Sequence, residues 1–188
     1  MDFHAYRQAL ADTLEGSELP FPADELRLRL ARTRALMTEA GRDALLLTDP
    51  ADIFYLTGYH TFEVSVHTAL LVTAERVVLQ VPSIETGPAV VTARVDEIIG
   101  YRWEDISEVI EPLLALLSPC QHIGLDVYSA GLRYAIIQPL LNRLGKACFH
   151  HDGGALLDSQ RLVKSEAELN CLRESARITA IGLRAAEA

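Results

Sequence analysis

Cysteine is scarce in this chain, and no hydrophobic run is long enough to cross a membrane. Three cysteines occur in 188 residues, at positions 120, 148 and 171, and none forms a Cys-x-x-Cys pair. This spacing gives neither a zinc knuckle nor a disulfide framework, so it predicts three buried free thiols in a reducing compartment. No apolar run approaches the ~20 residues of a membrane span, and the N-terminus lacks a signal-peptide core. The sequence therefore predicts a cytoplasmic protein that does not bind a membrane.

Basic residues are also few. The chain has 17 Lys and Arg against 26 Asp and Glu, which gives a formal net charge of −9. Binding of phosphate backbones needs a basic face, so nucleic acid is excluded as a partner. Hydrophobic residues make up 49% of the chain, enough for the dense core of one good-sized domain and the start of a second.

Familiar catalytic motifs are missing as well. The sequence contains no G-x-G-x-x-G, no G-x-x-x-x-G-K-[ST], no H-E-x-x-H and no G-x-S-x-G. His150 and His151 are adjacent, so on a strand they would point to opposite faces and could not bind one metal together. His122 begins a predicted strand, and His4 lies in the segment before Pro20. None of these four histidines is predicted to be catalytic.

Helical and extended patterns alternate along the chain. A short helix at 3–15 precedes Pro20 and Pro22. Further helices are expected at 24–41, 83–93, 105–117 and 129–145, and strands at 43–48, 66–73, 77–81, 95–101, 122–127 and 147–151. The short link between the second and third strands predicts an antiparallel hairpin. This order predicts an α/β fold, with a mixed sheet between two layers of helices.

A new amphipathic helix begins near the end of the sequence. Ser165 and Glu168 have the S-x-x-E spacing of a capping box. Apolar residues then recur at steps of three and four, at positions 169, 172, 176, 180 and 183. The helix has a clear start, but the sequence offers no partner for its apolar face. We therefore expect that more chain normally follows.

The segment 52–67 is the strongest candidate for a functional site. It is predicted to be a loop after a strand, and such loops carry function because a rigid sheet positions them. Its polar and aromatic side chains could together line a small polar pocket, and we select Tyr59, His60, Phe62, Glu63 and His67. The alternative is that Phe54, Tyr55 and Phe62 belong to the core and the rest is surface.

Two stretches together resemble the N-terminal domain of the creatinase and Xaa-Pro peptidase (prolidase, aminopeptidase P) family. The first is Asp43-Ala-Leu-Leu-Leu followed by Asp49-Pro50-Ala-Asp52-Ile-Phe-Tyr55-Leu-Thr-Gly58-Tyr. The second is the spacing of Ile123-Gly124-Leu-Asp126, Leu156-Leu-Asp158, Arg161, Lys164-Ser165, Glu168, Leu172-Arg173 and Ala176. The resemblance covers residues 24–188 and includes that family's junction into its catalytic domain.

The resemblance implies a ribonuclease-H-like three-layer α/β/α domain at 24–160, after an N-terminal arm at 1–23. Residues 161–188 would be the linker and first helix of a C-terminal "pita-bread" domain that is missing here. In the family's peptidases that domain holds two metal ions with two aspartates, a histidine and two glutamates. This chain is therefore expected to carry no cofactor, no metal and no complete active site, and to be inactive in isolation.

The resemblance also implies a homodimer in which the loop after Tyr-Leu-Thr-Gly reaches the partner's active site. By that analogy Tyr59, His60, Phe62, Glu63 and His67 contact substrate. Creatinase uses an aromatic residue and an arginine of this loop for its substrate's carboxylate, and no Arg or Lys occurs at positions 53–75. Creatine is therefore disfavoured, whereas a proline-containing dipeptide, or a small amide or cyclic amidine as in ectoine hydrolase relatives, stays open.

Three hypotheses follow from the sequence. The first is an accessory domain of a C–N hydrolase, which supports dimerisation and lends loop residues to the partner's site. The second is a stand-alone interaction or small-ligand-binding module without catalysis. The third, a self-sufficient enzyme, is the least favoured because it needs a nucleophile–base pair or a metal cluster that the sequence does not display.

Overall fold

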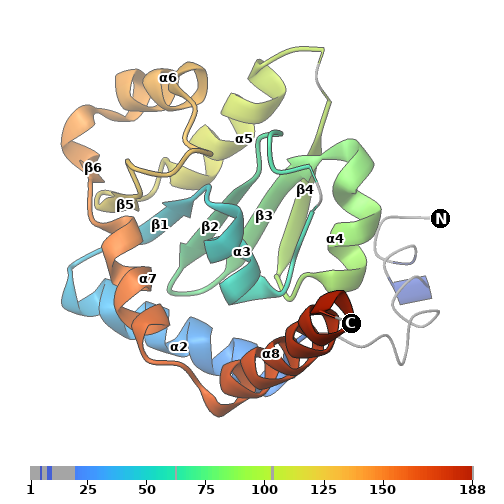
Figure 1. Ribbon diagram of the computed structural model, residues 1–188. Coiled ribbons are helices and arrows are strands. Elements are labelled where there is room, and N and C mark those ends of the chain that lie inside the picture. The colour runs from blue at the N-terminus through green and yellow to red at the C-terminus, as the bar shows by residue number, and fades with distance from the viewer. Residues whose placement is uncertain (1–4, 6–7, 10–19, 62, 103, 188) are drawn as a thin grey trace.

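A mixed six-stranded sheet forms the centre of the molecule in the computed structural model, which describes residues 5, 8, 9, 20–61, 63–102 and 104–187 (Figure 1). The strands are β1 (Ala44–Leu47), β2 (Ala69–Thr73), β3 (Val77–Pro82), β4 (Glu97–Tyr101), β5 (Ile123–Leu125) and β6 (Phe149–His150). Their order is β4-β3-β2-β1-β5-β6. β2 runs antiparallel to both of its neighbours, and the other pairs are parallel. The predicted mixed sheet and the hairpin are confirmed; the helix expected at 3–15 lies mostly outside the described residues.

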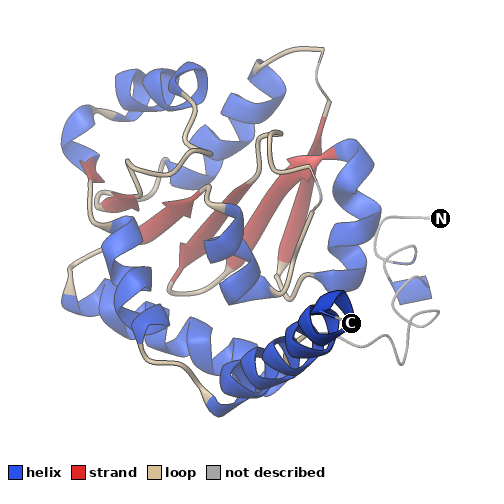
Figure 2. Cartoon of the chain, in the orientation of Figure 1, coloured by secondary structure: helices blue, strands red, loops and turns tan. Residues whose placement is uncertain are grey.

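Helices cover both faces of this sheet (Figure 2). One face packs against α2 (Ala23–Glu39), α3 (Pro50–Thr57), α4 (Thr86–Thr92) and α7 (Gly153–Leu162), and the other against α5 (Ser107–Leu117) and α6 (Tyr134–Leu144). Short 3-10 turns occupy Ser83–Glu85 and Lys146–Cys148. The predicted α/β/α layering is confirmed.

Strand β1 shows why the sheet has two cores. Its four residues are all buried. Leu45 and Leu47 belong to the core beneath α2 and α3, whereas Ala44 and Leu46 belong to the core beneath α5 and α6. Because side chains alternate along a strand, a continuous apolar run fits a strand that is covered on both faces.

Two backbone segments approach closely where β1 ends. A Cβ atom at Gly131 would lie 2.1 Å from the carbonyl oxygen of Thr48. We therefore expect Gly131→Ala to lower the free energy of unfolding by about 1–3 kcal/mol, since the backbone would have to move. Gly87→Ala is the matched control, because a Cβ there meets nothing within 4 Å. Urea denaturation measures both, and a Gly131→Ala protein as stable as wild type would contradict this close approach.

The three cysteines are free, as predicted, but they are not fully buried. Cys120 and Cys148 are half-buried, and Cys171 is exposed. Cys120 follows the end of α5 and Cys148 lies in a 3-10 turn, so both sit at the margin of the core. The expectation of three buried thiols was wrong because the apolar interior is filled by the strands and the inward faces of the helices.

The last described helix, α8 (Glu166–Glu187), begins with the predicted capping box. The backbone N–H of Ser165 donates to the Glu168 carboxylate at 2.9 Å, and the N–H of Glu168 donates to the Ser165 hydroxyl at 3.2 Å. Beyond this start none of the helix's described residues is buried. Local capping therefore fixes where the helix begins, and contacts near residue 168 fix its position against the rest of the domain.

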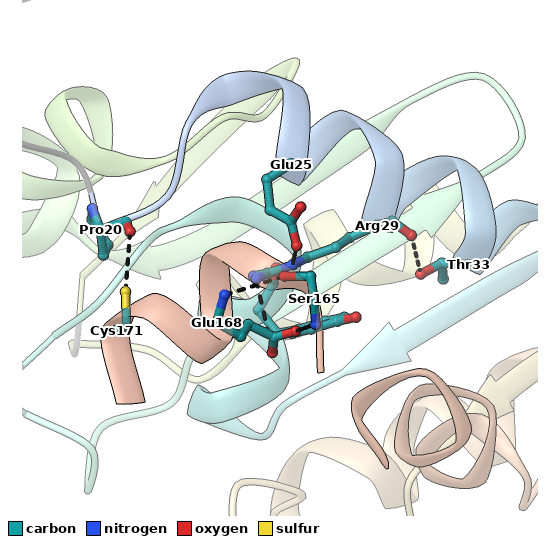
Figure 3. A network of polar contacts seen from close by, with 8 residues as sticks. Pro20, Glu25, Arg29, Thr33, Ser165, Glu168 and Cys171 are labelled. Carbon is teal, nitrogen blue, oxygen red and sulfur yellow. Dashed lines mark hydrogen bonds and ion pairs between the residues drawn. The ribbon is translucent and has the colours of Figure 1, made fainter. Parts of the chain in front are cut away.

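Arg29 of α2 is the anchor for the start of α8 (Figure 3). Its side chain is 1% exposed and stacks between the rings of Phe21 and Tyr55, at 4.1 and 4.3 Å from their centroids. Its guanidinium donates to Glu25 and to the Tyr55 carbonyl, both at 3.0 Å. Glu168 lies 3.8 Å from the remaining nitrogen. A buried cation thus joins α2, α3 and α8.

Candidate functional site

The chain between β1 and β2 forms a helix followed by an extended segment. Asp49 caps α3 by accepting hydrogen bonds from the N–H groups of residues 51 and 52, at 2.8 and 3.2 Å, and Pro50 occupies the first helical position. Gly58 ends the helix with φ of 77°. The expectation of a loop over 52–67 was therefore wrong for its first part, because the Asp-Pro pair begins a helix here.

A cavity of about 250 Å³ lies between α3 and the segment that follows it. Its walls are mostly apolar and aromatic, so the expectation of a polar pocket was wrong; they include Ile53, Phe54, Tyr59, His60, Val64 and Val66. Thr48, which directly follows β1, and Thr68, which directly precedes β2, also line it. Such a site can take one small apolar group, with a few polar atoms available to orient it.

Tyr59 forms a wall of this cavity and is itself buried at 2% exposure. Its hydroxyl donates to the Glu85 carboxylate at 3.1 Å, and its backbone N–H donates to the Thr57 hydroxyl at 3.1 Å. Burial, and then the Glu85 charge, raise the pKa of Tyr59 above its ordinary value. Tyr59 therefore stays a neutral, fixed side chain and shapes the site.

His60 is the exposed member of the group. It lines the cavity and makes an edge-to-face contact with Phe54, at 6.2 Å between ring centroids and 82° between planes. An exposed imidazole beside an apolar cavity can donate or accept a hydrogen bond. Of the predicted site residues, His60 is the one best placed to meet a ligand.

Two other predicted residues, Glu63 and His67, do not line the cavity. Glu63 is half-buried, accepts hydrogen bonds from the backbone N–H and the hydroxyl of Ser65, and does not line the cavity. Phe62 lies outside the described residues. Tyr59 and His60 are thus brought together, and Glu63 is turned toward its own loop.

His67 belongs to the interior rather than to the cavity. It is 2% exposed, and its Nε2 lies 3.2 Å from the Gln80 amide oxygen. Because the Gln80 amide nitrogen donates to the Val109 carbonyl at 3.0 Å, its oxygen accepts and His67 Nε2 carries the proton. Burial lowers the pKa of His67 to about 4, against the pull of the Gln80 hydrogen bond. His67 is therefore a neutral, structural histidine at ordinary pH.

An ion pair that the sequence did not suggest connects the first turn of α3 to α7. Arg161 of α7 donates to the Asp52 carboxylate at 2.7 Å. Burial raises the pKa of Asp52 to about 6, although the Arg161 charge draws it down. At the same end of the sheet, the hydroxyls of Thr48 and Ser129 form a hydrogen bond of 3.1 Å. These contacts connect residues 81 and 109 positions apart, so sequence spacing gave no signal for them.

Within the described part of the chain, no group of three or more His, Cys, Asp or Glu side chains is placed to hold a metal ion. The same ranges contain no helix that is both long and apolar enough to cross a membrane. The described lining of the cavity therefore offers an exposed imidazole, that of His60, rather than a set of metal ligands.

Comparison with known proteins places this geometry in a family. Residues 29–163 match the sequence profile described as the creatinase/prolidase N-terminal domain. Bacillus subtilis (strain 168) has a similar protein, the candidate dipeptidase YkvY, which is 29% identical over 157 residues. The alignment covers 82% of this chain and 43% of that protein, so the chain spans less than half the length of this curated relative.

Solved structures share the fold. The prolidase from Pyrococcus horikoshii OT3 superposes with a TM-score of 0.67 at 18% identity, over 85% of this chain and 42% of that one. The Creatine_N superfamily domain of a dipeptidase from Streptococcus thermophilus superposes with a TM-score of 0.57 at 19% identity, over 70% of this chain and 97% of that one. At these identities the likeness concerns the fold alone.

Proposed function

Since this chain belongs to the creatinase/prolidase N-terminal domain family, we propose that it is the accessory domain of a peptidase-like C–N hydrolase. In this role it supports a homodimer and lends loop residues to the active site of the partner subunit. The observation that carries the proposal is the family match over residues 29–163, together with a coverage of only 43% of the similar dipeptidase YkvY. The remaining length of such a protein would supply the catalytic groups.

Helix α8 supports this proposal. The apolar face predicted for this helix, at positions 169, 172, 176, 180 and 183, includes Leu172 and Leu183, which are 53% and 62% exposed. An apolar stripe on a capped helix normally packs against another element. In the proposed protein this stripe packs on the C-terminal catalytic domain, and residues 161–188 form the linker and first helix of that domain, after the domain at 24–160 and the arm at 1–23.

The substrate class is inferred from the cavity and the family. A small apolar cavity with an exposed imidazole beside it suits an uncharged apolar group of a small amide or of an Xaa-Pro dipeptide. Positions 53–75 contain no Arg or Lys, so this segment offers no cation to a substrate carboxylate. His60 is the proposed substrate contact, Tyr59 fixes the wall, and Glu63 and Phe62 remain predicted contacts in the assembled dimer. Three free thiols fit the cytoplasm as its compartment.

Kinetics of the full-length hydrolase test the role of His60. We expect His60→Ala to lower kcat/KM for an Xaa-Pro dipeptide by about tenfold, which corresponds to the loss of one hydrogen bond, about 1.4 kcal/mol. His151→Ala is the control, because His151 is exposed and does not line the cavity. Both variants should keep the unfolding midpoint of wild type. Wild-type kinetics in His60→Ala would remove this residue from the site.

The cavity itself favours one alternative, a stand-alone module that binds a small ligand. Sedimentation and peptidase assays on the 188-residue chain separate the two. The accessory-domain proposal predicts a dimer that hydrolyses no Xaa-Pro dipeptide, with or without added Mn²⁺. A monomer that binds a small apolar amide saturably, with His60→Ala abolishing that binding, would favour the module.

A further inference from the structure

A pair of histidines lies at the end of the sheet opposite to the cavity. His122 directly precedes β5 and His150 ends β6, and these two strands are parallel neighbours. The cavity instead adjoins Thr48, at the carboxyl end of β1, which runs parallel to β5. The pair is therefore separate from the proposed substrate contact, and its chemistry is independent of the proposed function.

The two imidazoles meet nitrogen to nitrogen. His122 Nδ1 lies 3.1 Å from His150 Nε2, and the ring planes are inclined at 46°. Zinc binds imidazole nitrogen at about 2.0–2.1 Å. Two such bonds at octahedral or tetrahedral angles place the nitrogens roughly 2.9–3.4 Å apart. The observed separation falls inside that range, so a metal ion could replace the proton that the two rings now share.

Hydrogen bonds to Asp43 fix both backbone polar groups of His122. Its N–H donates to the Asp43 carboxylate at 2.9 Å, and its carbonyl accepts from the N–H of Asp43 at 2.8 Å. His150 is fixed by its register opposite Gly124 in β5. His150 thus stands on β6 and His122 directly beside β5, and both need little ordering before they bind, which favours affinity.

The histidine pair is open to water on one side only. Gly124 and His150 are paired in register and share one face of the sheet, and on that face a Cβ at Gly124 would lie 2.6 Å from the Leu45 side chain, so the space over Gly124 is already packed. His122 is exposed and His150 is half-buried, so water can reach the pair. The nearby Asp152 carboxylate is engaged by Arg42, through contacts of 2.6 and 3.0 Å. Two imidazoles and water, rather than three protein ligands, would therefore coordinate the ion.

From this arrangement we propose that His122 and His150 form a two-histidine site for a divalent transition metal of the class that prefers imidazole, namely Cu²⁺, Ni²⁺ or Zn²⁺. The bound ion links β5 to β6, which has only two residues and lies at the edge of the sheet. Metal binding therefore fastens that edge. Affinity follows the usual order for nitrogen ligands, with Cu²⁺ above Ni²⁺ and Zn²⁺.

Titration of the metal-free, tag-free chain with each of these metal salts tests the proposal, by calorimetry and, for Cu²⁺, by electron paramagnetic resonance. We expect one saturable site per chain, a Cu²⁺ spectrum with hyperfine splitting from two nitrogens, and a higher unfolding midpoint with metal. His122→Ala and His150→Ala should each weaken binding by more than about tenfold, since outer-shell changes alone cost 10- to 100-fold.

His151→Ala is the matched control, because His151 is the exposed neighbour of His150 and is predicted to leave affinity unchanged. Circular dichroism checks that each variant is folded. The proposal is overturned if His122→Ala binds the metal as tightly as wild type, or if His151→Ala is the variant that loses metal binding. It is also overturned if wild type shows no saturable binding at millimolar metal.

Discussion

Replacing Arg29 with methionine lowers the free energy of unfolding by about 3 kcal/mol or more. Methionine keeps most of the apolar packing between Phe21 and Tyr55, whose rings lie 4.1 and 4.3 Å from the guanidinium carbon. It removes the hydrogen bonds to Glu25 and to the Tyr55 carbonyl, both at 3.0 Å. A largely buried carboxylate and a buried carbonyl then lose their partner, and this loss carries most of the cost.

Arg27→Met is the matched control in the same helix. Arg27 pairs with Asp24, but their side chains are 76% and 82% exposed. An exposed pair of this kind contributes at most about 1 kcal/mol. Urea denaturation of the three proteins measures the difference. If the Arg29 variant lost no more stability than the Arg27 variant, the buried cation would not be the anchor described here.

The same substitution should also loosen the start of α8. Glu168 would lose the positive charge that lies 3.8 Å away, while keeping its bond to the Ser165 N–H. We expect faster amide hydrogen exchange over the first turns of α8 than in wild type. Unchanged exchange there, together with a large loss of stability, would confine the role of Arg29 to the contact between α2 and α3.

The second large effect concerns acid stability and His67. The pKa of this histidine is about 4 in the folded protein, against about 6.5 in an unfolded chain. The unfolded state therefore binds the proton first as pH falls. The stability that neutral His67 contributes is fully present above about pH 6.5 and is lost between pH 6.5 and 4, by about 3 kcal/mol in total.

His67→Gln isolates this effect, because a glutamine amide can still donate to the Gln80 oxygen without titrating. We expect the variant to lose less stability than wild type as pH falls from 7 to 4. Wild type and the variant must be compared because Asp52 also titrates in this range. Its pKa is raised to about 6 in the folded protein, so its protonation increases the stability of both proteins as pH falls from about 6 to 4. His60→Gln is the control, since His60 is exposed. Parallel pH curves for wild type and His67→Gln would refute a buried neutral histidine.

Local signals in the sequence predicted much of the fold. The apolar run at β1, the hairpin of β2 and β3, and the Ser165–Glu168 capping box each depend on residues a few positions apart, and all three are confirmed. Helix α3 also had a local signal, since aspartate followed by proline is typical of a helix start. The expectation of a loop over 52–67 missed that helix.

Long-range contacts explain the remaining differences. A helix was expected at 129–145, but the Ser129 hydroxyl lies 3.1 Å from that of Thr48, and α6 begins only at Tyr134. The glycine pair at 153 and 154 begins α7, a helix that was not among those expected, and a Cβ at residue 153 would lie 2.8 Å from the backbone of Leu125. Neither partner is visible from sequence spacing.

The candidate site could be predicted only in part for the same reason. The sequence pattern indicated the correct segment for the cavity and included Tyr59 and His60, which line it. It gave no sign that His67 turns into the core toward Gln80. Nor did it indicate the His122–His150 pair, because parallel pairing of β5 with β6 brings together residues that are 28 positions apart.

The most direct test of the accessory-domain role is to read the source gene past codon 188. An accessory domain predicts that the reading frame continues into a second domain, against which the apolar stripe of α8 packs. Two aspartates, a histidine and two glutamates in that domain would make the whole protein a dinuclear metallopeptidase, and their absence would indicate a metal-free C–N hydrolase. A stop codon directly after Ala188 would contradict the accessory role and leave the small-ligand module as the function.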